Sequence, residues 1–286
     1  MRKFLPFLIL FLVLISEHSI GQSRILTNTP SSLLRNGQTE IQSYQNMYTE
    51  VNFRGADGIE QMGNRRTTYF TSLNYVLFGV SNNKRFNIGM DISFRTVFTD
   101  SIISSPLNTF RLQGNNLQRS GITSLGPKVK FLPFKNITNL SVQSAVWIPV
   151  MDSLETKSNQ PWLDWDRYTS WTQFFYDIKT DKFQYFFEVD LLARFGKSGS
   201  GHGIQLNTPV SFFLSYIPND KFILYGMTQY FPTITSENTY FIQFGIGSKI
   251  QVSKRLNLEF MFTDFFQSGA WGGTGQTFNI GLRWIK

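Results

Sequence analysis

The sequence predicts an all-β protein, an antiparallel transmembrane β-barrel of about twelve strands preceded by a cleaved signal peptide. Three observations lead to this prediction. About twelve segments alternate apolar and polar residues with a period of two, which is typical of strands with one apolar face. The connections between these segments alternate long and short along the chain. The amino terminus has the form of an export signal.

The first residues are interpreted as the signal peptide. Arg2 and Lys3 precede an apolar run over residues 4–15, and small residues follow at Ser19 and Gly21. The apolar run is too short to cross a membrane as a helix. We predict a signal peptide over residues 1–21, a polar periplasmic segment or partial plug over 22–44, and the barrel over 45–286.

The amino-acid composition favours a barrel with an apolar outer surface and a polar, hydrated interior. Phe contributes 29 residues and aromatic residues make up 16% of the chain, yet the mean hydropathy is slightly negative. The formal charge is +8, but the positive residues are scattered, so no nucleic-acid partner is expected. The chain has no cysteine, which excludes disulfides and a lipidated cysteine anchor.

The early strands differ in how clearly they alternate. In the third, Phe86, Ile88 and Met90 alternate with polar or small residues; in the second, Tyr69, Leu73, Tyr75 and Leu77 share the apolar face. The sixth is ambiguous, since aromatic residues occupy both of its faces. The first nine predicted strands are 45–54, 67–80, 85–98, 121–132, 138–148, 168–178, 183–195, 208–216 and 221–231.

The last three strands lie within residues 238–286 and alternate most regularly. Ile242, Phe244 and Ile246 share one face of the first of them. Apolar side chains likewise alternate over 256–263 and 277–284, where the sequence ends on a strand with Trp284 close to its last residue. Outer-membrane barrels finish in this way, with the last strand closing onto the first.

The connections predict an orientation in the cell outer membrane. Long connections are expected outside the cell and short turns in the periplasm, with both termini periplasmic. Each short turn carries a lysine, so the periplasmic rim is expected to meet anionic headgroups of outer-membrane lipid, although ordinary solvation of turns explains the lysines as well. Insertion requires the outer-membrane insertion machinery as a partner.

The polar faces of the strands are expected to line a lumen. Seven basic and six acidic residues are placed inward, and this near balance predicts that opposite charges pair and leave the pore narrow or closed. Inward aromatic residues are predicted at Phe70, Trp147, Trp171 and Phe175. The predicted inward charges are Glu50, Arg54, Asp91, Arg95, Lys128, Lys130, Asp177, Glu188, Asp190, Arg194, Lys249, Glu259 and Arg283.

One stretch resembles a known family. Residues 120–131 form a glycine-containing strand that ends in Lys128-Val129-Lys130-Phe131, and the next strand ends in Trp147-Ile148-Pro149. This resembles outer-membrane barrels grouped with the phenol meta-pathway proteins, which are related to the long-chain fatty-acid transporter type. The match covers about 30 residues and departs at Ser124-Leu125, where the family usually has Gly-Asp. The resemblance implies a barrel that handles small apolar molecules.

Two function classes remain open: a passive channel or facilitator for small apolar or amphipathic solutes, and a non-transporting scaffold in an outer-membrane or surface assembly. The scaffold would bind a protein partner through tryptophan-rich loops at residues 161–165 and 269–272. We expect no enzyme, because the single histidine after the leader, His202, lies among glycine and serine. With no cysteine and one histidine there, no metal site or cofactor is expected.

Overall fold

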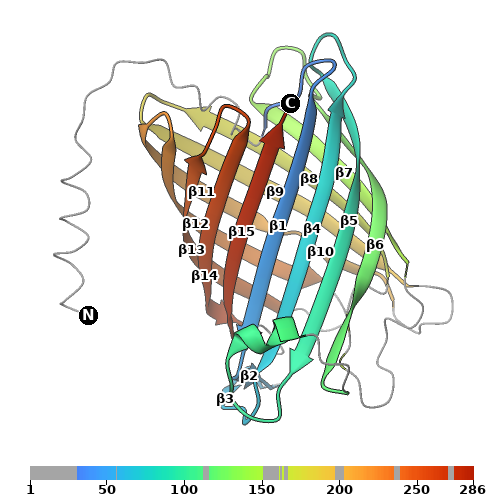
Figure 1. Ribbon diagram of the computed structural model, residues 1–286, viewed down its shortest axis with the longest axis vertical. Coiled ribbons are helices and arrows are strands. Elements are labelled where there is room, and N and C mark those ends of the chain that lie inside the picture. The colour runs from blue at the N-terminus through green and yellow to red at the C-terminus, as the bar shows by residue number, and fades with distance from the viewer. Residues whose placement is uncertain are drawn as a thin grey trace.

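The computed structural model describes residues 31–55, 57–111, 116–150, 161, 163, 167–196, 203–234, 239–269 and 274–286. The predicted signal peptide and residues 22–30 lie outside these ranges, as does His202. Within the described chain, twelve long antiparallel strands form a closed barrel (Figure 1). The predicted all-β barrel is therefore confirmed. No described helix is both long and apolar enough to cross a membrane.

Neighbouring strands of the barrel follow one another in the sequence, and the last strand pairs with the first. This closure leaves no free edge, so the backbone hydrogen bonds are satisfied around the whole ring. The long strands are β1 (Thr39–Glu50), β4 (Thr67–Gly79), β5 (Phe86–Thr99), β6 (Gln118–Phe131), β7 (Leu140–Pro149), β8 (Tyr168–Lys179), β9 (Phe183–Phe195), β11 (Val210–Asn219), β12 (Phe222–Ile234), β13 (Thr239–Gln251), β14 (Leu256–Ser268) and β15 (Gln276–Ile285).

Shorter elements lie mostly in the long connections. β2 (Phe53–Arg54) pairs with β3 (Glu60–Gln61), and the 3-10 helix η2 (Pro106–Arg111) follows β5. β10 (Gln205–Asn207) pairs with β9 on one side and with β12 on the other, as β11 does. Thr208 and Pro209 separate β10 from β11, which follows it in the sequence. η2, β2 and β3 lie at the bottom of Figure 1, whereas the carboxyl terminus lies at the top, with the short turns.

The first strand begins earlier than its pattern predicts. β1 runs over Thr39–Glu50 rather than 45–54, so residues 39–44 belong to the barrel wall, and residues 53–54 belong to the small sheet of β2 and β3. The outward positions of β1 include the polar residues Ser43 and Gln45, which hide the apolar alternation that marks the other strands.

The second predicted strand begins at the right residue and ends one residue late, but its two faces are exchanged. Tyr75 lines the interior, with the Lys128 ammonium 3.7 Å from its ring centroid, and the buried Leu77 shares this face. Phe70 is therefore outside, where its ring packs edge-on against Phe110 at 4.9 Å between centroids. The prediction that Phe70 faces the lumen is wrong. Both faces of β4 carry bulky residues, so its pattern does not reveal which face is inside.

The start of the described chain enters the barrel mouth at the short-turn end. The Ser31 backbone N–H donates to Asp177 Oδ2 on β8 at 3.0 Å, and both residues are buried. Leu34 is also buried, and a Cβ at Gly79 on β4 would meet its Cβ at 3.0 Å. Residues 31–34 thus connect β8 with β4 across the mouth, so this end of the lumen is narrowed by the protein's own chain.

Gly126 explains the glycine of the stretch that resembles a family. A Cβ at this position would lie 1.8 Å from the Val146 carbonyl oxygen, so β6 and β7 approach too closely for any side chain. We expect Gly126→Ala to lower the free energy of unfolding by about 1–3 kcal/mol because the strands must separate. Urea titration of the folded barrel measures this change.

Gly226 on β12 provides the matched control for that substitution. A Cβ there has one neighbour within 4 Å, the Gly245 carbonyl oxygen at 3.9 Å. Gly226→Ala should leave the unfolding midpoint almost unchanged. Equal effects of the two substitutions would contradict a steric role for Gly126.

Candidate functional site in the barrel lumen

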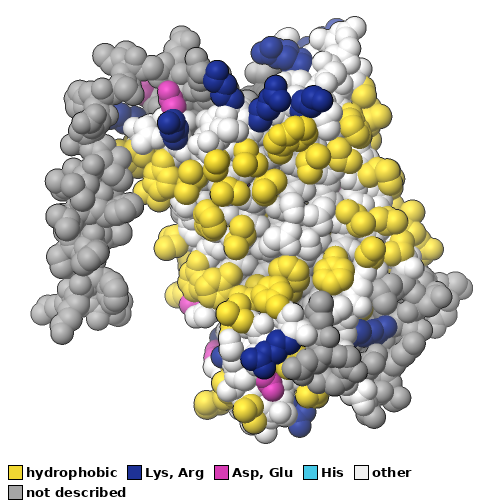
Figure 2. All heavy atoms as spheres, viewed as in Figure 1, with side chains coloured by type: hydrophobic (Ala, Val, Ile, Leu, Met, Phe, Trp, Pro, Cys, Tyr) yellow, Lys and Arg dark blue, Asp and Glu magenta, His cyan; other side chains and the backbone are white. Residues whose placement is uncertain are grey.

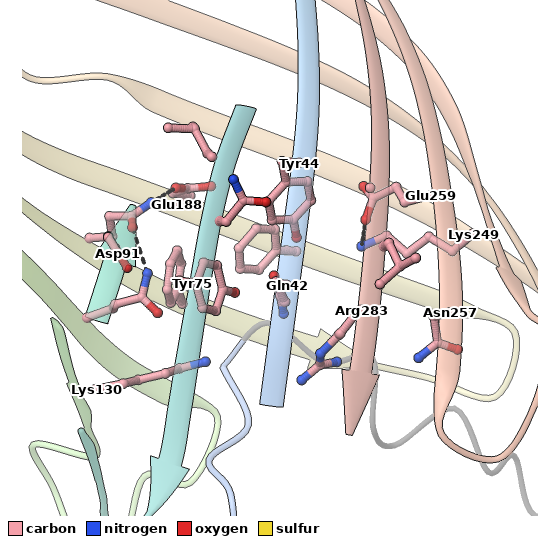
Figure 3. Close-up of a pocket in the computed structure, with 18 of the residues that line it drawn as sticks. Gln42, Tyr44, Tyr75, Asp91, Lys130, Glu188, Lys249, Asn257, Glu259 and Arg283 are labelled. Atoms are coloured by element: carbon pink, nitrogen blue, oxygen red, sulfur yellow. Dashed lines mark hydrogen bonds and ion pairs between the residues drawn. The ribbon is translucent and has the colours of Figure 1, made fainter. Parts of the chain in front are cut away.

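The candidate site is a cavity of about 300 Å³ inside the barrel. Its walls are the inward side chains of strands all around the ring, from β1 to β15. Figure 3 draws 18 of these residues and labels ten of them, including Tyr75, Asp91 and Arg283, which point into the space between the strands. The site therefore results from barrel closure, because residues from both ends of the sequence meet in it.

One wall is centred on a buried ion pair between β5 and β6. Lys128 Nζ lies 2.9 Å from Asp91 Oδ1, and both side chains are less than a tenth exposed. Trp147 Nε1 donates to the other Asp91 oxygen at 2.8 Å, and Lys128 also lies over the Tyr75 ring. Each charge has a partner of opposite sign and an aromatic neighbour, so the pair is locally neutral.

Two more ion pairs occupy the wall formed by β1 and β13 to β15. Arg283 on β15 forms an ion pair with Glu40 on β1, and Lys249 Nζ lies 3.3 Å from Glu259 Oε2 (Figure 3). The Tyr225 hydroxyl donates to the other Glu259 oxygen at 2.7 Å. These contacts explain how acidic and basic residues of near-equal number fit into one lumen.

A pair of carboxyl groups on β9 has a different environment. Glu188 accepts a hydrogen bond from Gln173 at 2.6 Å, and Asp190 accepts one from Trp171 Nε1 at 2.9 Å. Neither carboxyl group is within ion-pair distance of a described basic side chain. The Trp171 ring also packs edge-on against Trp147, with 5.2 Å between centroids. This part of the wall therefore combines acidity with aromatic surface.

Aromatic rings cover the wall from β8 to β12. The rings of Phe175, Phe186, Phe213 and Tyr225 follow one another with centroid distances of 5.7, 5.3 and 6.1 Å, and all four line the cavity. Lys130 Nζ lies 5.5 Å from the Phe175 centroid, where the aromatic wall meets the basic one. The cavity thus presents an apolar surface on one side and polar groups on the other, as an amphipathic molecule requires.

The structure places ten of the predicted lumen residues directly on the cavity: Asp91, Lys128, Lys130, Trp147, Trp171, Phe175, Glu188, Lys249, Glu259 and Arg283. Asp190 bonds to one of them, Trp171. Arg95 lines a second cavity beside the first, with Glu259. Glu50 lies at the end of β1, where it accepts a hydrogen bond from the Tyr48 hydroxyl. Arg194 lies near the end of β9, paired in register with Gln205.

Arg54 does not belong to this set. It lies on β2 in a long connection, where its guanidinium forms an ion pair with Glu60 at 3.2 Å. The prediction that Arg54 faces the lumen is therefore wrong. It followed from extending the first strand to residue 54, four residues beyond its end at Glu50.

Sequence reasoning missed several residues of the cavity. Glu40 precedes the predicted first strand, so its pairing with Arg283 was not foreseen. Gln42 and Tyr44 were missed for the same reason, and the polar Ser43 on the outward face leaves no apolar alternation that would reveal them. Phe186 and Phe213 interrupt otherwise polar inward faces, and only the three-dimensional arrangement shows that they form one surface.

Two predicted features depend on residues that the structure describes only in part. His202 and most of the tryptophan-rich loops lie outside the described residues. Leu163, within the loop at residues 161–165, is fully buried against Val97. In the described chain, no group of three or more histidine, cysteine or acidic residues is arranged to hold a metal ion.

Comparisons with known proteins agree on the fold. No protein-family model matches the sequence, and no curated protein is similar to it. Among solved structures, an outer membrane channel from Pseudomonas putida F1 superimposes with a TM-score of 0.64 at 12% identity, covering 90% of this chain and 97% of that one. The β domain of the Bordetella autotransporter BrkA gives a TM-score of 0.52 at 8% identity, covering 86% and 98%. The chain therefore shares its fold with outer-membrane barrels.

Proposed function

We propose that the protein spans an outer membrane with its short turns in the periplasm. The long strands have 10 to 14 residues, enough to cross the hydrocarbon layer at the tilt of a barrel. Large apolar side chains such as Ile246, Met90 and Ile280 are more than half exposed on the outside. Figure 2 shows such side chains over much of the visible barrel wall. In water this surface would promote aggregation, whereas lipid would solvate it.

Charge at the rim supports the same orientation. The five short turns, at residues 80–85, 132–139, 180–182, 220–221 and 252–255, contain seven basic and two acidic residues. Lys and Arg side chains gather along the upper rim in Figure 2, which is the short-turn end. Positive charge at that rim favours contact with the anionic headgroups of a periplasmic leaflet.

Within that membrane, we propose that the protein is a passive channel for small amphipathic solutes. The observation that carries this proposal is the two-sided cavity, with aromatic rings on β8 to β12 facing ion pairs and tyrosines on β1 to β6. A solute with an apolar body and a polar group can contact both walls at once. Because the described charges are largely paired, no single sign of charge holds the solute tightly, and release stays fast.

The resemblance of residues 120–149 to barrels that handle apolar molecules supports this solute class, and the similarity in fold to a bacterial outer membrane channel is consistent with a channel. The narrowing of one mouth by residues 31–34 agrees with a solute-sized rather than a wide pore. The alternative scaffold function stays a prediction, since most of the tryptophan residues that would anchor a partner lie outside the described residues.

Liposome swelling with two zwitterionic solutes tests the channel proposal. Phenylalanine and glutamine both cross lipid slowly by themselves, but only phenylalanine carries a ring that can pack against the aromatic wall. We expect vesicles containing the protein to swell several-fold faster in phenylalanine than in glutamine. Equal rates would remove the amphipathic preference, and no swelling in either solute would contradict a channel.

Adjacent residues of β11 provide a matched pair of variants. Phe213 faces the cavity within the aromatic wall, whereas Phe212 faces outward and packs against Phe187, with 5.0 Å between centroids. Phe213→Ala should reduce the preference for phenylalanine, and Phe212→Ala should leave it unchanged. Loss of the preference in both variants would show that it arises outside the cavity.

A further inference from the structure

The outer surface of β1 and β4 carries a block of four polar side chains. Ser43 and Gln45 lie on β1, and Asn74 and Ser72 are their register partners on β4. The alternation along both strands places them on the same outward face as Ile41 and Phe78, which are 43% and 44% exposed. We call these four residues the polar block.

Apolar residues surround the polar block on every side. Its register partners on β15 are Leu282 and Ile280, and those on β5 are Ile92 and Phe94. Along the strands it lies between the pairs Ile41–Val76 and Met47–Phe70. Figure 2 shows a white area at mid-height of the barrel wall between hydrophobic side chains. The polar block therefore lies near the middle of the proposed membrane layer and not at a rim.

Hydrogen bonds join the four side chains into one directed chain. Gln45 Nε2 donates to Ser43 Oγ at 2.8 Å, and Ser43 Oγ donates to Asn74 Oδ1 at 2.6 Å. Asn74 Nδ2 then donates to Ser72 Oγ at 2.9 Å. Within the described chain, neither the side-chain carbonyl oxygen of Gln45 at one end nor the hydroxyl proton of Ser72 at the other has a further hydrogen-bond partner. Lipid offers no partner for either group.

The polar block is self-complementary, because its acceptor end and its donor end lie on neighbouring strands. When two copies inserted the same way up contact each other through this same face, they are related by a two-fold axis along the membrane normal. Such an axis places Gln45 of one copy opposite Ser72 of the other, so that an acceptor meets a donor twice. The apolar ring around the block would then exclude lipid from these hydrogen bonds.

We propose that the polar block is the centre of a homodimer interface, formed between the β1–β4 faces of two copies of this chain. Polar side chains that bond across the contact are a recurring means of association within membranes, where apolar surface alone gives no driving force. The proposal rests on the proposed membrane location but is independent of solute transport, so a dimer without conductance and a conducting monomer are distinguishable results.

Cysteine cross-linking in lipid tests the interface directly, because the chain has no cysteine of its own. Ser72→Cys lies in the polar block, whereas Thr172→Cys on β8 is a matched outward position, bonded to Ser144 at 3.0 Å. In lipid nanodiscs, a short bis-maleimide should give covalent dimers of Ser72→Cys several times more abundantly than of Thr172→Cys. Equal yields, or capture of Ser72→Cys by a different protein in native membranes, would overturn the proposal.

A second pair of variants tests the hydrogen bonds. Gln45→Leu with Asn74→Leu should weaken dimerisation by roughly tenfold while the barrel still folds. Ser144→Leu with Thr172→Leu, which removes a different outward polar pair, should leave dimerisation unchanged. Heat-modifiable migration in gels reports folding of each variant. An unchanged dimer fraction in the first variant, or a monomer in the unmodified protein, would contradict the proposed interface.

Discussion

Arginine in place of Phe260 is expected to destabilise the folded barrel by about 2–4 kcal/mol, the cost of a charged side chain on the lipid face near the bilayer midplane. Phe260 is 41% exposed on β14, and its register partners are Ser248 on β13 and Ile280 on β15. Neither of these register partners is acidic, so they offer no group to pair with arginine. Urea-dependent unfolding of the protein from lipid vesicles measures the loss.

The next residue on the same strand provides the control. Met261 faces inward and lines the second cavity with Arg95 and Glu259. An arginine there can reach Glu259 and water, so Met261→Arg should cost less than about 1 kcal/mol. If Met261→Arg destabilises the barrel more than Phe260→Arg does, the assignment of inside and outside on β14 is reversed.

Removal of Lys128 is expected to cost about 3–5 kcal/mol of stability, because Asp91 would remain buried without its cation. The two side chains are 6% and 8% exposed, so water screens them little. Lys128→Met retains much of the side-chain volume while removing the charge. Thermal or urea unfolding, monitored by heat-modifiable migration, gives the magnitude.

A double variant separates the ion pair from simple packing. Asp91→Asn keeps an acceptor for the Trp147 hydrogen bond but removes the stranded charge, so it should restore most of the stability lost in Lys128→Met. Lys254→Met, in a short turn, is the control for loss of a surface lysine. If Lys128→Met is no more costly than Lys254→Met, the ion pair contributes little to the fold.

Much of the barrel could be predicted because its outward residues follow a simple rule. Along β9, apolar residues such as Phe183 and Phe187 face out, whereas polar residues such as Gln184 and Glu188 face in. This regular alternation marks the whole strand, and its predicted and observed bounds agree. β1 breaks the rule because its outward face carries the polar block, and its prediction began six residues late. β4 breaks the rule because both of its faces carry bulky residues, and the prediction therefore exchanged its inward and outward faces.

The candidate site could be predicted only as a set of inward positions. The alternation of inward and outward residues along each strand assigned Asp91, Lys128 and Glu259 to the lumen, but it does not show which charges pair. Glu40 and Arg283 are 243 residues apart in the sequence and meet only because the last strand closes onto the first. The aromatic wall likewise forms only because β8, β9, β11 and β12 are neighbours in the barrel. The periodicity of a single strand gives no information about its neighbours.

The current through the purified protein in a planar lipid bilayer tests the proposed channel most directly. The unmodified protein is compared with a variant lacking residues 31–36, the segment that narrows the short-turn mouth. We expect discrete conductance steps from both proteins and a larger step from the variant, because its mouth is wider. Correctly folded protein that inserts but carries no current in either form would contradict the proposed channel.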